Sequence, residues 1–417
     1  MKKKRIAIVS IWIDKIHGTE RCVAEQIERL AKTYELHIYS YYVKDLKTKW
    51  IPSREYHKNK HSKSNQSDQS WPASLIIHHK IPEIPGPHIL KYVWWFIINH
   101  LYRWWDRVIH KLHYDLIFAP GINCFDADLI IAYHVFLEYY QCVKEELRFT
   151  RNSLRLWPYI IHRMIFYKII IFLERIIFAD AKIIFGAPSN KTAASLLQYF
   201  GNKAFTIYPG IDTSVFNKNA RLRHRTEERN KLGIKEEDFV VLFIGNDWKE
   251  KGLPCLIQAI SLLNDLPICL IVRGKDRQSP YEKMIHQIDL SNNIRFLDPV
   301  PDIINLYAVA DLYASPSLYD SFAFPPAEAM ACGLPVIVSN RAGVFEIITD
   351  NHDGIILKDP YDAKDLSNRI RFVYEDIALR NHLSNNAELT AQSYSWERNA
   401  QQLCTIIEDI FSKKVLK

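Results

Sequence analysis

Residues 320–337 read Asp320-Ser-Phe-Ala-Phe-Pro-Pro-Ala-Glu328-Ala-Met-Ala-Cys-Gly-Leu-Pro-Val-Ile337, with two acidic residues eight positions apart. The two consecutive prolines suit the first turn of a helix, where a missing backbone N–H costs nothing. Gly333 suits the end of that helix, and residues 335–338 form the apolar run of a short buried strand. The stretch therefore predicts a turn, a short helix and a strand, with Glu328 in the first helical turn.

This arrangement has a chemical use. The backbone N–H groups at a helix N-terminus favour phosphate, and a carboxylate one turn into the helix accepts hydrogen bonds from sugar hydroxyls. The stretch therefore predicts a site for a nucleotide-sugar.

The same stretch resembles the signature of family 4 glycosyltransferases, which has an acid, seven residues, then Glu, followed by Ala-Met-Ala-x-Gly-x-Pro-Val. The resemblance implies a retaining enzyme with two Rossmann-like domains, the GT-B architecture. It implies that Glu328 binds the ribose of the donor nucleotide, that Asp320 is catalytic, and that the loop after Asp320 holds the donor sugar and diphosphate. The loop residues are Ser321, Phe322, Ala323 and Phe324. The family usually has Glu where this chain has Asp320, and a Gly where it has Ala323.

Residues 244–253, Ile-Gly-Asn-Asp-Trp-Lys-Glu-Lys-Gly-Leu, resemble the phosphate site of the family. Its usual form is Gly-Arg-x-x-x-x-Lys-Gly, in which fixed cations stabilise the departing diphosphate without solvent reorganisation. Lys251 matches the lysine, Asn246 stands in place of the arginine, and Lys249 is a candidate for the second charge. This version is similar to that of glycosyltransferases of the lipopolysaccharide core.

Three further positions match the family. Gly18 follows the first predicted strand, where the family has a glycine close to the donor phosphate. Residues 207–216 resemble the passage between the two domains. His134 ends a predicted strand and corresponds to a histidine that the family places near the donor sugar, although a lone histidine is often structural. The proposed catalytic residues are thus His134, Asp320 and Lys251.

The order of elements predicts the fold class. Strands alternate with helices in both halves, which indicates parallel, helix-covered sheets in an α/β protein. We expect two facing Rossmann-like domains with a cleft between them. Residues 1–206 form the N-terminal acceptor-side domain, completed by a C-terminal helix at about 399–417. Residues 207–218 form a linker, and residues 219–398 form the nucleotide-sugar-binding domain.

Composition excludes several classes of protein. The seven cysteines form no Cys-x-x-Cys pair, which argues against a disulfide framework or a zinc site and favours a cytosolic protein. No stretch reaches the roughly 18 uncharged residues of a membrane span. We expect no cofactor, no metal ion and no nucleic acid partner.

Residues 1–180 hold 27 of the 54 basic residues but only 18 of the 47 acidic ones, so the positive excess lies in the first half.

Two segments of the first half leave alternatives open. Residues 44–71 are polar and lack apolar periodicity, which predicts an exposed or disordered loop or a basic surface for an anionic acceptor. Residues 92–112 have helical spacing, with an apolar face and a polar face. The apolar face contains Trp94, Ile98, Leu101, Trp105, Val108 and Leu112, and the polar face contains Asn99, Arg103, Asp106, Arg107 and His110. This helix either lies in a membrane interface or covers the N-terminal sheet.

These features together predict a retaining, metal-independent glycosyltransferase. It would move a hexose from a nucleotide diphosphate-sugar to a surface-glycan acceptor, lipid-linked, in lipopolysaccharide or exopolysaccharide biosynthesis. We expect it in the cytoplasm, at the inner face of the membrane if residues 92–112 bind there. The alternative is a weakly active homologue that serves as a membrane-attached scaffold or glycan-binding subunit, which the departures at Asn246 and Ala323 favour.

Overall fold

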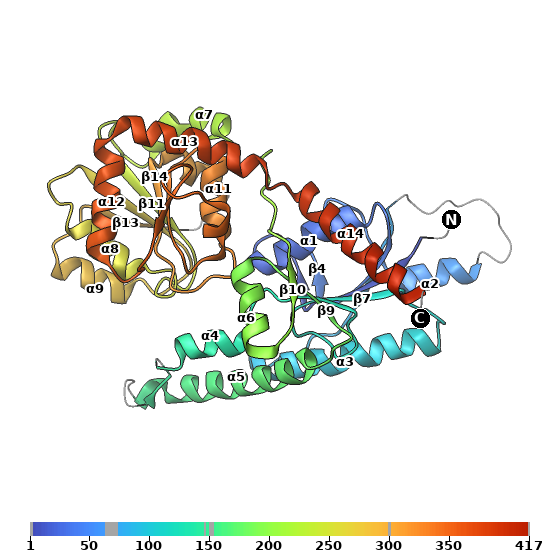
Figure 1. The fold of residues 1–417 in the computed structure, drawn as a ribbon. Coiled ribbons are helices and arrows are strands. Elements are labelled where there is room, and N and C mark those ends of the chain that lie inside the picture. The colour runs from blue at the N-terminus through green and yellow to red at the C-terminus, as the bar shows by residue number, and fades with distance from the viewer. Residues whose placement is uncertain (1–2, 63–73, 146, 150–153, 299–301, 416–417) are drawn as a thin grey trace. The chain divides into compact units, whose positions relative to one another are not determined.

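A computed structural model describes residues 3–62, 74–145, 147–149, 154–298 and 302–415. The chain divides into an N-terminal unit, Met1–Tyr208 with Trp396–Lys417, and a C-terminal unit, Pro209–Ser395. Each unit is built on its own parallel sheet with helices on its faces (Figure 1). The predicted pair of Rossmann-like sheets is confirmed.

In the described part of the N-terminal unit, eight parallel strands follow the order β10-β9-β8-β7-β1-β3-β6-β5. Their central members are nearly continuous apolar runs, as expected for strands covered on both faces. The strands are β1 (Arg5–Val9), β3 (Glu35–Ser40), β5 (Ile51–Pro52), β6 (Ile76–Lys80), β7 (Leu116–Pro120), β8 (Leu129–Ile131), β9 (Ile184–Ala187) and β10 (Ala204–Thr206). The short strands β2 (Trp12–Ile13) and β4 (Tyr42–Val43) pair separately.

The helices of this unit are α1 (Gly18–Leu30), α2 (Ser53–Ser62), α3 (His88–Val108), α4 (Phe136–Val143), α5 (Trp157–Phe178), α6 (Asn190–Phe200) and α14 (Trp396–Val415), with a 3-10 turn at Leu154–Leu156. The last helix packs on α1 although almost the whole chain separates them in sequence. Gln26 donates to Asn399 at 3.1 Å, and the Tyr34 hydroxyl donates to Glu408 at 2.6 Å. These contacts hold the C-terminal helix in the N-terminal unit.

The C-terminal unit has a six-stranded sheet in the order β13-β12-β11-β14-β15-β16. Numbered along this unit, the order is 3-2-1-4-5-6, the order of a dinucleotide-binding Rossmann sheet. The strands are β11 (Phe239–Ile244), β12 (Ile268–Arg273), β13 (Ile294–Leu297), β14 (Leu312–Ser315), β15 (Val336–Ser339) and β16 (Ile355–Leu357).

Its helices are α7 (Lys218–Lys231), α8 (Leu253–Ser261), α9 (Ser279–Gln287), α10 (Ile304–Val309), α11 (Phe324–Ala331), α12 (Ala363–Glu375) and α13 (Ile377–Gln392), with a 3-10 turn at Gly343–Ile347. Apolar residues of β11 and β12 form one buried cluster with α8 and α12. Trp248, from the loop after β11, is fully buried in this cluster and stacks on Phe296. The core therefore anchors a loop that the sequence assigns to the phosphate site.

Helix α3 faces in a direction that the sequence did not predict. Asn99, Arg103 and Asp106, expected on the solvent side, are buried, whereas Trp104 and Trp105 are 58% and 54% exposed. The buried polar groups have partners from other elements, as buried polar groups require. Arg103 donates to Asp126 at 2.7 Å, and Asp106 accepts from Tyr39 at 2.5 Å. The expected polar face is thus wrong for these three residues.

The same buried face of α3 also covers the sheet. Tyr92, Trp95 and Phe96 belong to the buried cluster formed with β1, β7 and β8. Helix α3 therefore covers the N-terminal sheet with one face and exposes apolar residues on another, so the two predicted alternatives do not exclude each other.

The expected loop at residues 44–71 contains regular structure. Within it, β5 joins the sheet edge and α2 follows directly, with Tyr56 buried against Leu75 and Ile77. The aromatic ring provides the apolar contact that the polar composition concealed. Residues 63–71 lie outside the described residues.

Candidate active site

The candidate site lies where the strand order of the C-terminal sheet reverses. Strand β11 pairs with β12 on one side and with β14 on the other, and all three are parallel. In open α/β sheets, ligands bind beyond the carboxyl ends of the strands at such a switch point. The two sequence motifs occupy the loops that follow β11 and β14.

The loop after β11 is folded tightly by its own residues and by the loop after β12. The Trp248 indole N–H donates to the Gly245 carbonyl at 2.8 Å, and the Trp248 backbone N–H donates to Asp276 at 2.8 Å. Asn246 accepts from the backbone N–H of Lys275 at 2.9 Å. The residue that replaces the arginine of the resembled family therefore ties two loops of the site together.

Gly252 brings the two motif loops into contact. Its φ of +82° is a conformation that glycine adopts readily. A Cβ at this position would lie 1.9 Å from the Pro316 carbonyl oxygen. Only a residue without a side chain fits between the loop after β11 and the loop after β14.

This contact places Lys251 beside Asp320. The lysine ammonium and the Asp320 carboxylate form an ion pair, with side chains 26% and 13% exposed. The other Asp320 oxygen accepts from the backbone N–H of Phe322 at 3.3 Å. The structure thus brings together two of the three predicted catalytic residues. Lys249 of the same loop is exposed.

The segment after β15 supports the Asp320 loop. The backbone N–H of Gly343 donates to the Asp320 carbonyl at 3.1 Å, and that of Val344 donates to the Phe322 carbonyl at 2.6 Å. These bonds hold residues 320–322 against the core, so the carboxylate is positioned by backbone contacts on both sides.

Helix α11 begins as predicted, and Ala323 is its N-cap residue, with φ of +74° and ψ of +103°. A non-glycine residue rarely adopts this conformation, and it costs of the order of 1–3 kcal/mol. The departure from the family's glycine therefore has a physical consequence, because this position needs a positive φ. Pro325 and Pro326 supply no N–H, so the donors at this helix end come from the residues before them.

Glu328 is 3% exposed and lies one turn into α11. Its Oε2 accepts from the hydroxyl of Tyr307, a fully buried residue of α10, at 2.7 Å. Burial and the adjacent Glu328 carboxylate hold the pKa of Tyr307 well above its usual range, so the hydroxyl remains a donor. Sequence reasoning missed Tyr307, because no motif residue marks it.

Arg273 is a second residue that the sequence analysis missed. It ends β12 directly opposite Ile244 of β11, and its carbonyl accepts from the Gly245 backbone N–H at 3.0 Å. Its Nε is buried, and no described residue accepts a hydrogen bond from it. A cation at this strand end adjoins the loop that carries Asn246.

Gly18 and His134 belong to the N-terminal unit, and their roles stay predictions. Gly18 is the first residue of α1, and the Asp14 carboxylate accepts from the backbone N–H of His17 at 3.1 Å in the turn before it. Burial of Asp14 opposes its ionisation, but hydrogen bonds from His17 and Ile16 outweigh this and lower its pKa. His134 is exposed between β8 and α4, with its ring 6.1 Å from that of Phe136.

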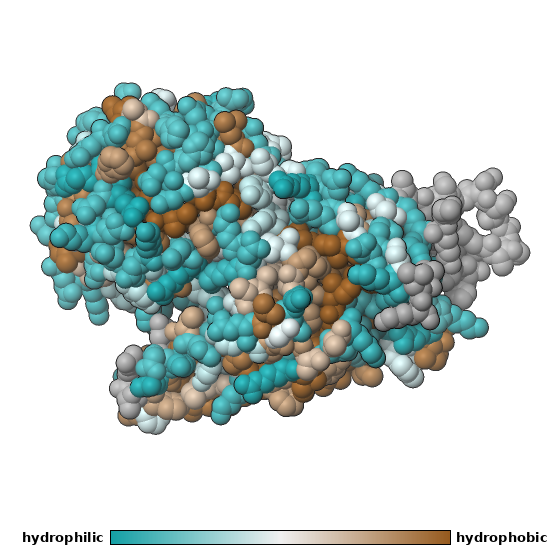
Figure 2. Space-filling view, viewed as in Figure 1, coloured by the Kyte–Doolittle hydropathy of each residue, from teal (hydrophilic) through white to brown (hydrophobic). Residues whose placement is uncertain are grey.

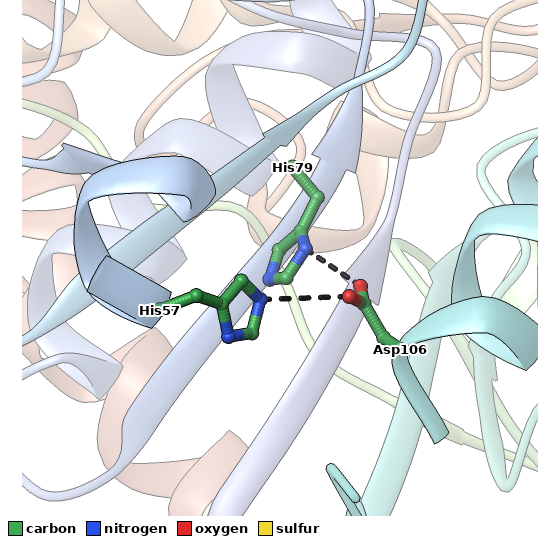
Figure 3. Close-up of side chains that lie close together, drawn as sticks. All are labelled: His57, His79 and Asp106. Atoms are coloured by element: carbon green, nitrogen blue, oxygen red, sulfur yellow. Dashed lines mark ion pairs between the residues drawn. The ribbon is translucent and has the colours of Figure 1, made fainter. Parts of the chain in front are cut away.

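The expectation that no metal ion is bound stays a prediction, although three residues that could ligate a metal ion converge among those described. His57, His79 and Asp106 come together in the N-terminal unit (Figure 3). They lie on α2, β6 and α3, too far apart in sequence to form a recognisable spacing.

Comparison with known proteins identifies the C-terminal unit. Residues 224–390 match the model of glycosyl transferases group 1. This stretch is a glycosyl transferases group 1 domain. The group 1 domain contains both motif loops, Tyr307 and Arg273.

A D-inositol 3-phosphate glycosyltransferase of Paenarthrobacter aurescens is 25% identical over 239 residues, which are 54% of this chain and 57% of that protein. The match thus spans a little over half the length of this curated relative. WaaG, a glycosyltransferase involved in lipopolysaccharide biosynthesis, has a TM-score of 0.72 at 19% identity, covering 96% of this chain and 99% of WaaG. Anabaena Alr3699/HepE, solved with UDP-glucose, has a TM-score of 0.67 at 18% identity, covering 97% and 99%. These likenesses extend the GT-B fold over nearly the whole chain.

Proposed function

We propose that this protein is a glycosyltransferase that moves a hexose from a nucleotide diphosphate-sugar to a glycan acceptor with retention of configuration. The observation that carries the proposal is the Lys251–Asp320 ion pair at the switch point of the group 1 domain. Glu328 lies eight residues beyond Asp320, buried and hydrogen-bonded by Tyr307.

The proposed chemistry needs fixed positive charge. Transfer leaves negative charge on the departing diphosphate, which preorganised cations stabilise in a partly water-excluded site. Lys251 supplies one charge, held in place by Asp320 before the donor binds. Arg273 supplies a second charge where Asn246 replaces the family's arginine, with Lys249 at the rim. In this proposal Glu328 accepts hydrogen bonds from the ribose, and no metal ion takes part.

The acceptor in this proposal is a surface glycan, lipid-linked, as in polysaccharide biosynthesis. The name of WaaG, a structural neighbour, supports this choice. The exposed apolar face of the N-terminal unit supports it independently, because a lipid-linked acceptor is presented at a membrane.

The test begins with thermal shift of the full chain against UDP-, GDP- and ADP-hexoses, since a bound donor stabilises the folded state. The stabilising donor is then titrated into Lys251→Met and Arg273→Gln, with Lys283→Met, an exposed lysine of α9, as the matched control. A charge-assisted hydrogen bond contributes about 1.5–3 kcal/mol, so we expect each site variant to bind roughly 10- to 100-fold more weakly.

Turnover of the stabilising donor should be lost in Lys251→Met and unchanged by added Mg²⁺ or Mn²⁺. Donor binding without transfer to any glycan acceptor would instead favour the scaffold or glycan-binding alternative. Equal affinity in Lys251→Met and Lys283→Met would refute the assignment of the diphosphate site.

We further propose that the N-terminal unit contacts lipid through α3 and α5. On α3, Ile97, Leu101, Trp104 and Trp105 are each more than half exposed, and Phe172 of α5 is 63% exposed. Figure 2 shows brown residues gathered along the edge where Figure 1 draws these two helices. Exposed apolar groups with basic residues among them, such as Arg107 and Lys168, suit a membrane interface.

An apolar hollow of about 510 Å³ lies within this surface. Its lining includes Phe96 and Ile97 of α3, Phe172 of α5 and Phe125 between β7 and β8, with Lys168 as its charged member. The hollow can receive an acyl chain while the lysine meets a phosphate headgroup. No helix in the described ranges has the length and hydropathy to cross a bilayer.

Flotation with phosphatidylglycerol vesicles tests this contact. Trp95 is fully buried and Trp94 donates to the Pro82 carbonyl, so neither suits substitution. The test variant is therefore Trp104→Ser with Trp105→Ser, and the control is Leu389→Ser, an equally exposed apolar residue of α13. We expect flotation to fall several-fold in the double variant alone. Unchanged flotation would overturn the proposed surface.

A further inference from the structure

His57, His79 and Asp106 form a convergent cluster in the N-terminal unit, outside the group 1 domain. Their candidate ligand atoms all lie within 4.8 Å of one another. Nδ1 of His79 is 2.8 Å from Oδ2 of Asp106, and Nε2 of His57 is 3.6 Å from Oδ1. The side chains are 12%, 2% and 7% exposed in chain order. Figure 3 shows both imidazoles directed at the carboxylate.

The hydrogen bonds behind His79 determine which of its nitrogens carries a proton. Glu35 accepts only, so Nε2 of His37, at 3.0 Å, donates to it. Nδ1 of His37 then accepts from Nε2–H of His79 at 2.9 Å. A neutral His79 consequently presents an unprotonated Nδ1 to Asp106.

An ionised Asp106 carboxylate has no proton to donate to Nδ1 of His79. It already accepts the Tyr39 hydroxyl at 2.5 Å, and among the described residues its ionic partners are the two imidazoles. Two acceptors at 2.8 Å repel unless a positive charge lies between them, and a buried carboxylate needs such a charge. A proton on His79 would satisfy this pair, and a metal ion would satisfy it as well while also binding His57, whose Nε2 lies 3.6 Å from Oδ1.

We propose that His57, His79 and Asp106 bind a divalent transition-metal ion, with Zn²⁺ as the first candidate. Two imidazole nitrogens and one carboxylate oxygen are a common zinc ligand set. Bonds of about 2.0–2.1 Å in a tetrahedron place ligand atoms roughly 3.3 Å apart. The two histidine–carboxylate distances, 2.8 Å to Oδ2 and 3.6 Å to Oδ1, lie on either side of this value, and one ligand atom from each residue lies within 4.8 Å of the other two.

The surroundings have the features of a metal site. A metal-bound histidine usually donates its other ring N–H to a fixed acceptor, and His79 does so to His37, which donates to Glu35. Arg5 in turn donates to Glu35 at 2.6 Å, and Tyr39 orients Asp106. His57 stacks on His110 with ring centroids 3.7 Å apart, which limits its rotation.

The position of the cluster indicates a structural role. Its ligands come from α2, β6 and α3, so an ion would join two helices to β6, the strand next to the edge of the sheet. The proposed donor residues Lys251, Asp320 and Glu328 all belong to the C-terminal unit, so none of them is a ligand of the proposed metal site.

Zinc stoichiometry of the full chain tests the proposal without reference to activity. The protein is stripped with a chelator, incubated with Zn²⁺, passed through gel filtration and measured by mass spectrometry of the metal. The variants are His57→Asn at the site and His286→Asn, an exposed histidine of α9, as control. We expect one zinc ion in the wild type and the control, and at least a tenfold loss of affinity in His57→Asn.

Thermal unfolding provides a second measurement. At zinc concentrations about 100 times the dissociation constant, the melting temperature of the N-terminal unit should rise by roughly 5 °C, and His57→Asn should abolish the rise. Retention of the ion by His57→Asn would assign it to another site and overturn the proposal. Absence of bound zinc in the wild type, with no change in melting temperature, would overturn the proposal equally and would favour a protonated His79 paired with Asp106.

Discussion

Replacement of Glu328 separates the stability of the group 1 domain from its binding of the donor. Glu328 lies at the first turn of α11, and its buried carboxylate accepts the Tyr307 hydroxyl at 2.7 Å. Glu328→Gln keeps the size of the side chain and one oxygen acceptor for that hydroxyl. Glu328→Ala removes the bulk of the side chain and its oxygen acceptor. The Tyr307 hydroxyl then has only the Pro325 carbonyl, 3.2 Å away, as an acceptor.

The two substitutions should therefore differ in their cost to stability. Loss of the hydrogen bond to the charged carboxylate costs about 1.5–3 kcal/mol even though the Pro325 carbonyl remains, and the space left by the side chain adds to this. We expect Glu328→Ala to lower the free energy of unfolding by about 2–4 kcal/mol, and Glu328→Gln to lower it by about 1 kcal/mol or less. Hydrogen exchange of peptides from this domain, measured in increasing urea, reports on its unfolding separately from that of the N-terminal unit.

Both substitutions should weaken donor binding, because both remove the negative charge of Glu328. If Glu328 accepts ribose hydroxyls, loss of its charge removes a hydrogen-bond contribution of about 1.5–3 kcal/mol, which is roughly a 10- to 100-fold change in affinity. Calorimetric titration of Glu328→Gln with the donor found by thermal shift measures this directly. Tyr307→Phe is the matched control, since it keeps the carboxylate and should weaken binding by less than about fivefold.

The reasoning would be refuted by a well-folded Glu328→Gln variant that binds the donor within about threefold of the wild type. Glu328 would then be a buried partner of Tyr307 without contact to the nucleotide. A loss of affinity in Glu328→Ala alone would not suffice as support, because that variant also loses stability.

Three further substitutions test the backbone of the two units by chemical unfolding. Gly252→Ala should cost at least about 2 kcal/mol and abolish donor binding, because its Cβ would meet the Pro316 carbonyl at 1.9 Å; a fully stable variant would contradict the contact. Ala323→Gly should raise stability by about 1 kcal/mol by relieving the positive φ, and a clear loss would show that the alanine is unstrained. Ser189→Ala should cost about 1 kcal/mol, since the Ser189 hydroxyl caps α6 by accepting from the Thr192 N–H at 3.2 Å; no change would deny the cap.

The local signals in the sequence were sufficient for the elements of the candidate site. The two prolines and Gly333 predicted α11, and alternation of strands and helices predicted parallel sheets in both units. These predictions succeed because capping, chain stiffness and burial act over a few neighbouring residues. The same local signals marked Ala323 as a departure, and the positive φ of that residue shows why a glycine is usual there.

The orientation of α3 illustrates where local signals fail. Helical periodicity identified its faces, but Arg103 and Asp106 are buried because they have polar partners there. Arg103 donates to Asp126, and Asp106 accepts from Tyr39 and pairs with His79. Each partner comes from a different part of the chain. The pattern of apolar and polar residues along the helix therefore does not reveal which of its faces is buried.

The sequence by itself determined the α/β alternation, the helix that carries Glu328, and Lys251 and Asp320 as separate candidates in two motifs. Those features depend on short-range preferences and on motifs a few residues long. Only the tertiary structure decided that Tyr307 holds Glu328, that Arg273 adjoins Asn246, and that His57, His79 and Asp106 converge. These arrangements join residues 21 to 49 positions apart, and only the order of parallel strands and the packing of helices on them brings such residues together.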